Sequence, residues 1–216
     1  MPGFDAKSVA ESLRRVRERI AAAGGDERVA VLAVTKGFGP EAIDAALAAG
    51  CAAIGENYAQ ELLAKRESAA RAEVHFIGQL QTNKVRQVAG LVDIYETVDR
   101  EHLAREIAKR DPGARVLVQV DTTGEPGKGG CAIAELDALV ATVRAAGLAL
   151  QGLMTVGPTE GGPESARSGF RAVRAAVDRL GLAMCSMGMT DDLEVAVQEG
   201  STQIRVGTAL FGARPR

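Results

Sequence analysis

The sequence predicts an α/β fold: a single-domain (β/α)8 TIM barrel with an extra N-terminal helix. Short apolar runs rich in β-branched residues alternate with longer stretches of helical spacing, and eight such units occur in 216 residues. Strands that alternate with helices pair in parallel through right-handed crossovers. No linker, repeat or low-complexity tract interrupts the series, so we expect residues 1–216 to form one domain. An open doubly wound sheet is the alternative.

Each element follows from a local pattern. The extra helix is expected at the start of the chain, where Val9, Leu13, Val16 and Ile20 mark one apolar face. The expected strands are 29–34, 52–55, 74–78, 92–98, 115–121, 148–154, 182–188 and 202–207. The helical stretches between them are 41–50, 60–70, 83–90, 100–110, 132–147, 168–181 and 191–200, and the short segment 208–212 follows the last strand.

Composition excludes several classes of function. A formal net charge of −2 provides no basic field for nucleic acid or an anionic membrane. The chain begins without a signal-peptide core and contains no apolar run long enough to span a bilayer, so a cytoplasmic location is expected. Cys51, Cys131 and Cys185 are odd in number and far apart, which predicts reduced packing residues and neither a disulfide framework nor a metal site.

A lysine stands at the end of the first strand, in "VLAVTKGFG". Active sites of such barrels lie at the C-terminal ends of the strands. An amine there is partly desolvated, which lowers its pKa and favours the neutral, nucleophilic form. Lys36 could therefore form a Schiff base with an aldehyde. The alternative is a lysine that extends to solvent from a strand end.

A phosphate site is predicted after the last two strands. Gly207 and Thr208 open a short helical turn, where backbone N–H groups and a hydroxyl can bind an anion. The segment "SMGMT", residues 186–190, would form the other side. Two tight turns that need glycine are the simpler alternative. A reactive lysine and a phosphate site together suit pyridoxal 5′-phosphate, although sugar phosphates of Schiff-base aldolases carry the same two groups.

Two other features are weaker signals. The segment "TTGEPGKGG", residues 122–130, lacks the glycine spacing of a P-loop and has Gly129 where Ser or Thr would bind magnesium. We expect it to be a mobile flap over the mouth of the barrel. His75 lies inside the apolar run "VHFIG", which favours a hydrogen-bonded core histidine over a general base.

Several motifs closely resemble the YggS/PROSC family of pyridoxal-phosphate-binding proteins. They are "AVTKGFGPEAIDAALAAG", "IGENYAQE", "HFIGQLQTNKVRQV", "GKGG", "GLMTVG" and "SMGMTDDLEVAVQEGSTQIRVGTALFGAR", which extend in the family's order from Val29 to Arg214. The resemblance implies the barrel of alanine racemase without that enzyme's second domain.

The resemblance also implies roles for individual residues. Lys36 matches the lysine that holds pyridoxal phosphate as an internal aldimine, and Arg205 matches the arginine that faces the pyridine nitrogen. Asn57 matches a residue beside the ring, and Met154 matches a methionine packed near it. The residues that match the phosphate site are Ser186, Met187, Gly188, Gly207 and Thr208.

The function implied is pyridoxal phosphate homeostasis without robust turnover. An arginine keeps its proton and leaves the pyridine nitrogen unprotonated, which makes the ring a weaker electron sink. Racemisation also needs a second acid/base, and neither Tyr58 nor Tyr95 is well placed in the sequence for that role. The alternative is a small amino-acid racemase. We expect a monomer that binds pyridoxal phosphate and delivers it to apo-enzymes that depend on this cofactor.

Overall fold

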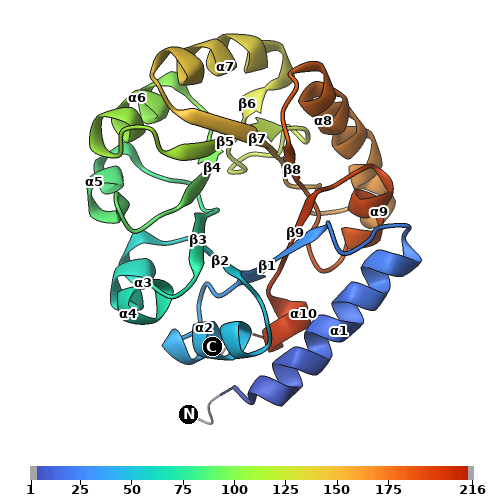
Figure 1. The fold of residues 1–216 in the computed structure, drawn as a ribbon. Helices are drawn as coiled ribbons and strands as arrows, with labels where there is room; N and C mark the ends of the chain where they lie inside the picture. Colours follow the sequence, from blue (N-terminus) through green and yellow to red (C-terminus); the bar gives the residue numbers. More distant parts are fainter. Residues whose placement is uncertain (1–3, 214–216) are drawn as a thin grey trace.

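All eight expected strands form, and they close into one parallel barrel (Figure 1). The computed structural model describes residues 4–213; the first and last three residues of the predicted domain, including Arg214 of the last motif, lie outside them. β1 pairs with both β2 and β9, and β4 pairs with β5, so the open-sheet alternative is wrong. The barrel strands are β1 (Ala30–Val34), β2 (Ala53–Glu56), β3 (Glu73–Phe76), β4 (Ile94–Val98), β5 (Arg115–Asp121), β7 (Ala149–Met154), β8 (Met184–Ser186) and β9 (Gln203–Val206).

Helices surround the barrel on the outside (Figure 1). The extra helix α1 (Ala6–Ala22) buries Val9, Val16 and Ile20 and contacts α2, α9 and α10, as its apolar face predicts. The other helices are α2 (Pro40–Ala48), α3 (Ala59–Ala64), α4 (Arg66–Ala69), α5 (Val85–Val88), α6 (Glu101–Arg110), α7 (Leu136–Ala145), α8 (Arg167–Arg179), α9 (Leu193–Gln198) and α10 (Thr208–Phe211). The predicted (β/α)8 barrel with an N-terminal helix is confirmed.

Two segments differ from the sequence prediction. A short strand, β6 (Cys131–Ala132), pairs in parallel with the end of β5, where the sequence predicts a loop and the start of a helix. The predicted helix 60–70 is divided at Lys65, whose backbone leaves the helical region between α3 and α4. The side chain of Lys65 is buried in an ion pair with Glu56, and the helical pattern of the sequence does not show that pairing.

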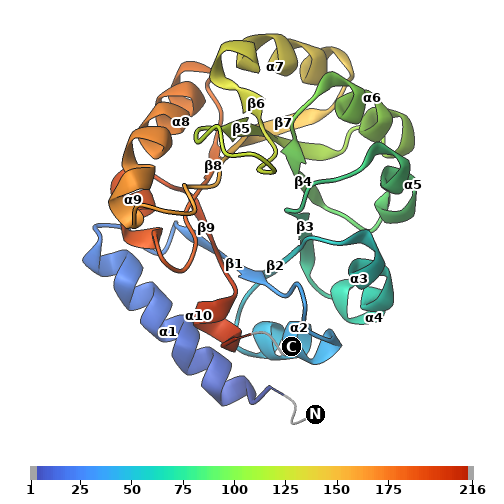
Figure 2. The same ribbon diagram turned by 180° about the vertical axis from the view of Figure 1, so that it is seen from behind.

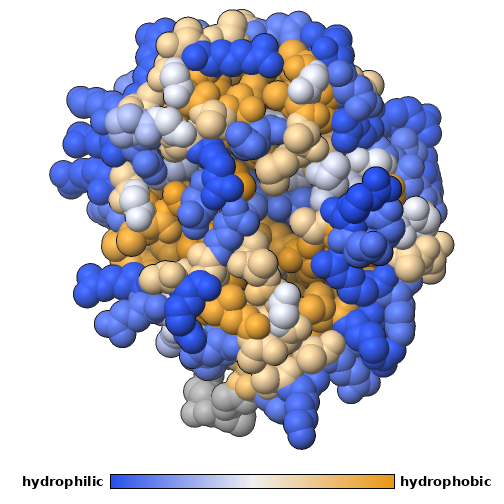
Figure 3. Space-filling view, viewed as in Figure 1, coloured by the Kyte–Doolittle hydropathy of each residue, from blue (hydrophilic) through white to orange (hydrophobic). Residues whose placement is uncertain are grey.

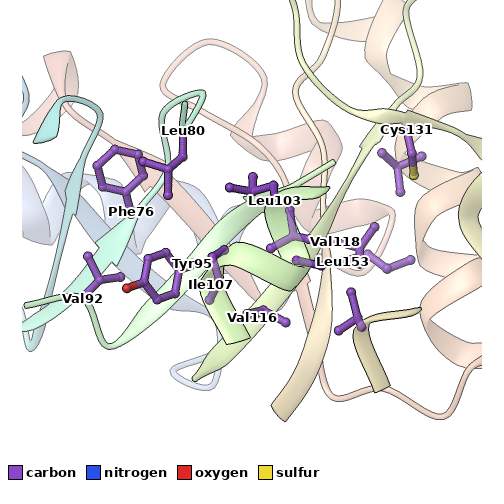
Figure 4. Packing of buried hydrophobic residues seen from close by; sticks show 14 of the residues in the cluster. Phe76, Leu80, Val92, Tyr95, Leu103, Ile107, Val116, Val118, Cys131 and Leu153 are labelled. Atoms are coloured by element: carbon purple, nitrogen blue, oxygen red, sulfur yellow. The ribbon is translucent and has the colours of Figure 1, made fainter. Parts of the chain in front are cut away.

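The core consists of a layer between the strands and the helices and a smaller layer inside the barrel. Val116 and Val118 of β5 face outward and belong to the same cluster as Leu103 and Ile107 of α6 (Figure 4). Leu117 of β5 belongs to a separate cluster with Ile94 and Met154. Successive residues of a barrel strand alternate between the two sides, and this alternation gives the interior its own set of side chains. Cys51, Cys131 and Cys185 are buried free thiols, as predicted.

The segment between β5 and α7 lies in front of β5, on one side of the barrel, at the end where the strands terminate (Figure 2). This segment includes residues 122–130, for which a mobile flap stays a prediction. Lys128 Nζ donates to the Gly157 carbonyl oxygen at 2.6 Å, and Glu125 accepts a hydrogen bond from the Thr159 backbone N–H at 2.9 Å. These contacts hold the segment against the loop after β7.

The opposite face has hydrophilic side chains over much of its periphery, with hydrophobic areas between them (Figure 3). Among residues 4–213, no helix has the length and apolar character needed to cross a membrane.

Candidate functional site

Lys36 lies where the sequence predicts, directly after β1. Residues 31–34 of this strand are buried, Thr35 is buried after them, and Lys36 is half-buried. Gly37 adopts a positive φ of 75°, which turns the chain away before α2 begins at Pro40. The apolar strand and this turn together place the lysine at the mouth of the barrel.

The side chain of Lys36 lines a pocket of about 190 Å³ at the ends of β1 and β9. Arg205, Gly207 and Thr208 line the same pocket. Residues far apart in the sequence therefore meet at one place. An amine, a guanidinium group and a hydroxyl group share this small volume, which is a donor set suited to a ligand with an aldehyde and an anionic group.

Arg205 extends inward from β9 and is 4% exposed. Its Nη1 donates to the carbonyl oxygen and to Oγ of Ser186, both at 2.8 Å, and its Nη2 donates to the Thr155 carbonyl oxygen at 2.7 Å. Burial lowers the pKa of Arg205, although a guanidinium group remains charged at any physiological pH. The three bonds fix the orientation of the guanidinium plane.

Glu96 of β4 provides the buried negative charge that faces Arg205. Its Oε1 lies 2.5 Å from His75 Nδ1 and 2.6 Å from Gln203 Nε2, and its Oε2 accepts from Ser186 Oγ at 2.7 Å. Burial alone would raise the pKa of Glu96, but the bond and charge of His75, the charge of Arg205 and the Ser186 bond outweigh it and lower this pKa. The predicted hydrogen-bonded core histidine is thereby confirmed at position 75.

The loop after β8 forms one wall of the pocket, through Met189, Thr190 and Asp191. Gly188 has a positive φ of 94°, and a Cβ there would lie only 2.4 Å from Cβ of Ala196. Only glycine fits this turn.

The same loop is bonded to its neighbours. The Thr190 carbonyl oxygen accepts a hydrogen bond from Arg19 of α1 at 2.8 Å. Thr190 Oγ1 accepts one from the backbone N–H of Ala209 in α10 at 3.4 Å. The two turns predicted to bind phosphate are therefore connected.

Not all the predicted residues reach this pocket. Asn57 lines a different pocket, with Tyr58 and Gln79, and its buried Oδ1 has no hydrogen-bond partner among the described residues. Met154 packs inside the barrel with Ile94 and Leu117.

Two residues of the predicted phosphate segment are fully buried. Ser186 directs its hydroxyl to Glu96, and Met187 belongs to the hydrophobic core. Within "SMGMT", Met189 and Thr190 line the pocket itself. The sequence analysis included these two residues in the segment without selecting them as site residues.

Lys65, Glu56 and Glu61 are the neighbours of Lys36 that the sequence analysis did not select. Glu61 and Lys65 belong to the predicted helix 60–70, whose charges follow an ordinary surface pattern, and Glu56 ends a strand. Nothing in the local pattern distinguishes them from solvated side chains.

The two tyrosines lie away from the Lys36 pocket. Tyr58 is 55% exposed at the start of α3. Tyr95 is buried and donates to Asp111 Oδ2 at 2.9 Å, and burial raises the pKa of its hydroxyl. Within the described part of the chain, no group of three or more His, Cys, Asp or Glu residues could hold a metal ion.

The fold and site define a barrel of the alanine racemase class. Residues 4–215 match the family described as alanine racemase, N-terminal domain. Alanine racemase of Bacillus anthracis superposes with a TM-score of 0.75 at 17% identity, and the match covers 98% of this chain but only 57% of that one. This likeness concerns the fold alone.

More similar proteins define the family. The pyridoxal phosphate homeostasis protein of Pseudomonas aeruginosa is 39% identical over 219 residues, which cover 97% of this chain and 95% of that protein. The structure of PipY from Synechococcus elongatus, with PLP bound, superposes with a TM-score of 0.81 at 30% identity and covers 94% of this chain and all of that one. The chain belongs to the YggS/PROSC family of pyridoxal phosphate homeostasis proteins.

We predict that Glu96→Gln lowers the free energy of unfolding by about 3–5 kcal/mol at neutral pH, because it removes the buried carboxylate that faces Arg205. The folded-state pKa of Glu96 lies below the ordinary value of 4.5. Its contribution is therefore complete above pH 4.5 and is lost as the pH falls through the folded-state pKa. Urea unfolding of both proteins at a series of pH values should show the difference narrowing in acid. A constant difference would contradict this account.

Proposed function

We propose that this protein binds pyridoxal 5′-phosphate in intracellular pyridoxal phosphate homeostasis, with Lys36 as the point of covalent attachment and without robust catalytic turnover. The convergence of Lys36, Arg205 and Thr208 on one pocket carries the proposal. When bound, the cofactor supplies an aldehyde that condenses reversibly with a neutral amine, and a phosphate that needs an anchor. The PLP-bound structure of PipY supports the assignment.

Different residues around the pocket would bind the aldehyde, the ring and the phosphate of the cofactor. Lys36 holds its amine at the mouth, and Arg205 donates toward the ring nitrogen from a rigid position. Asn57 and Met154 do not line the Lys36 pocket, so their proposed place beside the ring requires the ring to extend beyond it. The buried, unpartnered Oδ1 of Asn57 is an acceptor that a ligand hydroxyl would satisfy. The anchor for the phosphate consists of Gly207 and Thr208 on one side and of Ser186, Met187 and Gly188 on the other. With Ser186 Oγ bonded to Glu96, the backbone of residues 186–188 contributes on that side.

The surroundings of Arg205 favour holding the cofactor over transforming amino acids. Arg205 keeps its proton, so a ring nitrogen that faces it stays unprotonated. Neither tyrosine lines the Lys36 pocket, and the hydroxyl of Tyr95 is bonded to Asp111. Exchange of the α-proton of free amino acids in deuterated water distinguishes the two functions: a racemase exchanges it, and a binding protein does not.

The remaining assignments belong to the same proposal. Residues 1–216 act as one cofactor-binding domain, and the protein is a cytoplasmic monomer that delivers pyridoxal phosphate to apo-enzymes. Three buried free thiols suit a reducing compartment. A barrel that closes on itself leaves no strand edge that a second subunit must cover.

Lys36→Ala removes the amine and leaves the phosphate anchor intact. Purified wild-type protein with added pyridoxal phosphate should show a near-visible absorbance band of the covalently held cofactor, and the variant should lack that band but retain weaker binding. Lys109→Ala, on the exposed face of α6, is the control and should resemble the wild type. An equal band in Lys36→Ala would exclude Lys36 as the attachment point.

Thr208→Ala removes a hydroxyl that lines the pocket beside Gly207. We expect the affinity for pyridoxal phosphate to fall by about 0.5–3 kcal/mol, the range for one lost hydrogen bond, with the upper end for a charged partner. Equilibrium titration followed by absorbance measures the effect. Thr142→Ala removes a hydroxyl of α7 that donates to Glu101 at 3.2 Å and does not line the pocket, so this control should keep the wild-type affinity. Equal affinities in all three proteins would remove Thr208 from the anchor.

A further inference from the structure

A cluster of the buried Lys65 and Glu56 and the half-buried Glu61 contacts the backbone on both sides of Lys36. We infer that this cluster positions Lys36 for covalent attachment of the cofactor, with Lys65 as its central member. The inference rests on the proposed function, because it concerns the same lysine. None of the three residues lines the Lys36 pocket, so they are positioning residues that act through Lys36.

The residue before Lys36 is bound through both its backbone and its side chain. Lys65 is 4% exposed, and its Nζ donates to the Thr35 carbonyl oxygen at 3.0 Å and to Glu56 Oε1 at 2.5 Å. Thr35 Oγ1 donates to the same Glu56 oxygen at 2.5 Å. The peptide unit that joins Thr35 to Lys36 is therefore fixed by an ammonium group, which is itself fixed by a carboxylate.

The residue after Lys36 is bound to the same cluster. The backbone N–H of Gly37 donates to Glu61 Oε2 at 2.7 Å, and this oxygen lies 3.7 Å from Lys65 Nζ. Glu61 lies in α3 and Lys65 follows the end of this helix, four residues later, so the two side chains lie on the same side of it. The cluster holds the backbone on either side of Lys36 at two points.

Burial of the Lys65–Glu56 ion pair has a desolvation penalty, so stability alone does not explain its presence beside Lys36. A buried ion pair is often no better for stability than well-packed apolar side chains of the same volume. Glu56 is fully buried, its Oε2 has no hydrogen-bond partner among the described residues, and burial raises its pKa. A buried carboxylate and a buried ammonium group thus occupy a site that apolar side chains could fill, and the bonds of this pair and of the half-buried Glu61 go to the residues that flank Lys36.

Fixed geometry has a direct effect on covalent attachment. Bond formation between an amine and an aldehyde carbon needs a near-attack arrangement, and a displacement of about 1 Å can cost roughly 100-fold in rate. Release of the Thr35 and Gly37 peptide units would let the amine of Lys36 move. Thr208 belongs to a different part of the chain, after β9, so anchoring of the phosphate would persist.

The test measures covalent attachment of pyridoxal phosphate to Lys36 separately from noncovalent binding of its phosphate group. Attachment is followed by borohydride trapping of pyridoxal phosphate on Lys36 and peptide mass spectrometry; anchoring is measured as the affinity for pyridoxine 5′-phosphate, which has the phosphate but no aldehyde. In Lys65→Met, we expect attachment to slow by roughly 10- to 100-fold, with less than about a twofold change in affinity for pyridoxine phosphate. Tyr95→Phe, which loses a buried bond elsewhere, is the control for lost stability and should affect neither.

Two variants at Glu61 test the same inference if Lys65→Met does not fold. Glu61 is only partly buried, so both substitutions there are tolerated more easily. Glu61→Ala removes the acceptor for the Gly37 amide, whereas Glu61→Gln keeps one. Hydrogen exchange of the Gly37 amide in cofactor-free protein should accelerate in Glu61→Ala and be restored in Glu61→Gln, and the attachment rate should follow the same order.

Other results would overturn the inference. If attachment to Lys36 and affinity for pyridoxine phosphate fall by the same factor, or if Tyr95→Phe slows attachment equally, the cluster contributes stability alone. Unchanged attachment in both Lys65→Met and Glu61→Ala would also reject positioning. If wild-type protein shows no attachment to Lys36, the proposed function itself fails, and this outcome is distinct from a failure of the inference.

Discussion

One buried carboxylate organises the polar interior of the barrel. Glu96 of β4 accepts hydrogen bonds from Ser186 of β8 and Gln203 of β9, lies within bonding distance of His75 of β3, and faces the charge of Arg205. A buried charge is costly unless it is paired and hydrogen-bonded. This requirement fixes four strands relative to one another and holds the guanidinium group at the mouth in a single orientation.

A second set of charged side chains holds the backbone around Lys36 at the mouth of the barrel. Lys36 lies at the end of an apolar strand, and the peptide units on either side of it are bound to Lys65 and Glu61. The Glu96 network lies beneath Arg205, and the Lys65 cluster lies beside Lys36. Lys36 and Arg205 are therefore supported by two different sets of charged groups, as expected of a site that must hold a small ligand precisely.

Periodicity and the rule for strand ends predicted most of the fold and the principal site residue. The apolar runs located all eight strands, and the position of Lys36 after the first strand placed it at the mouth. Glu96 could not be found this way, because it lies within an apolar strand and its partner Gln203 is 107 residues away. Lys65 shows the same limit, because in the sequence it is one charge of an amphipathic helix. Ser186 was expected at the phosphate, but its hydroxyl is bonded to Glu96.

The central claim is that Lys36, Arg205 and Thr208 form one site for pyridoxal phosphate. A crystal structure of the protein grown with pyridoxal phosphate tests it most directly. The account predicts electron density continuous from Lys36 Nζ to the cofactor, the phosphate within hydrogen-bond distance of Thr208, and Arg205 beside the ring nitrogen. Cofactor density at another lysine, or its phosphate on the far side of the pocket from Thr208, would contradict the account.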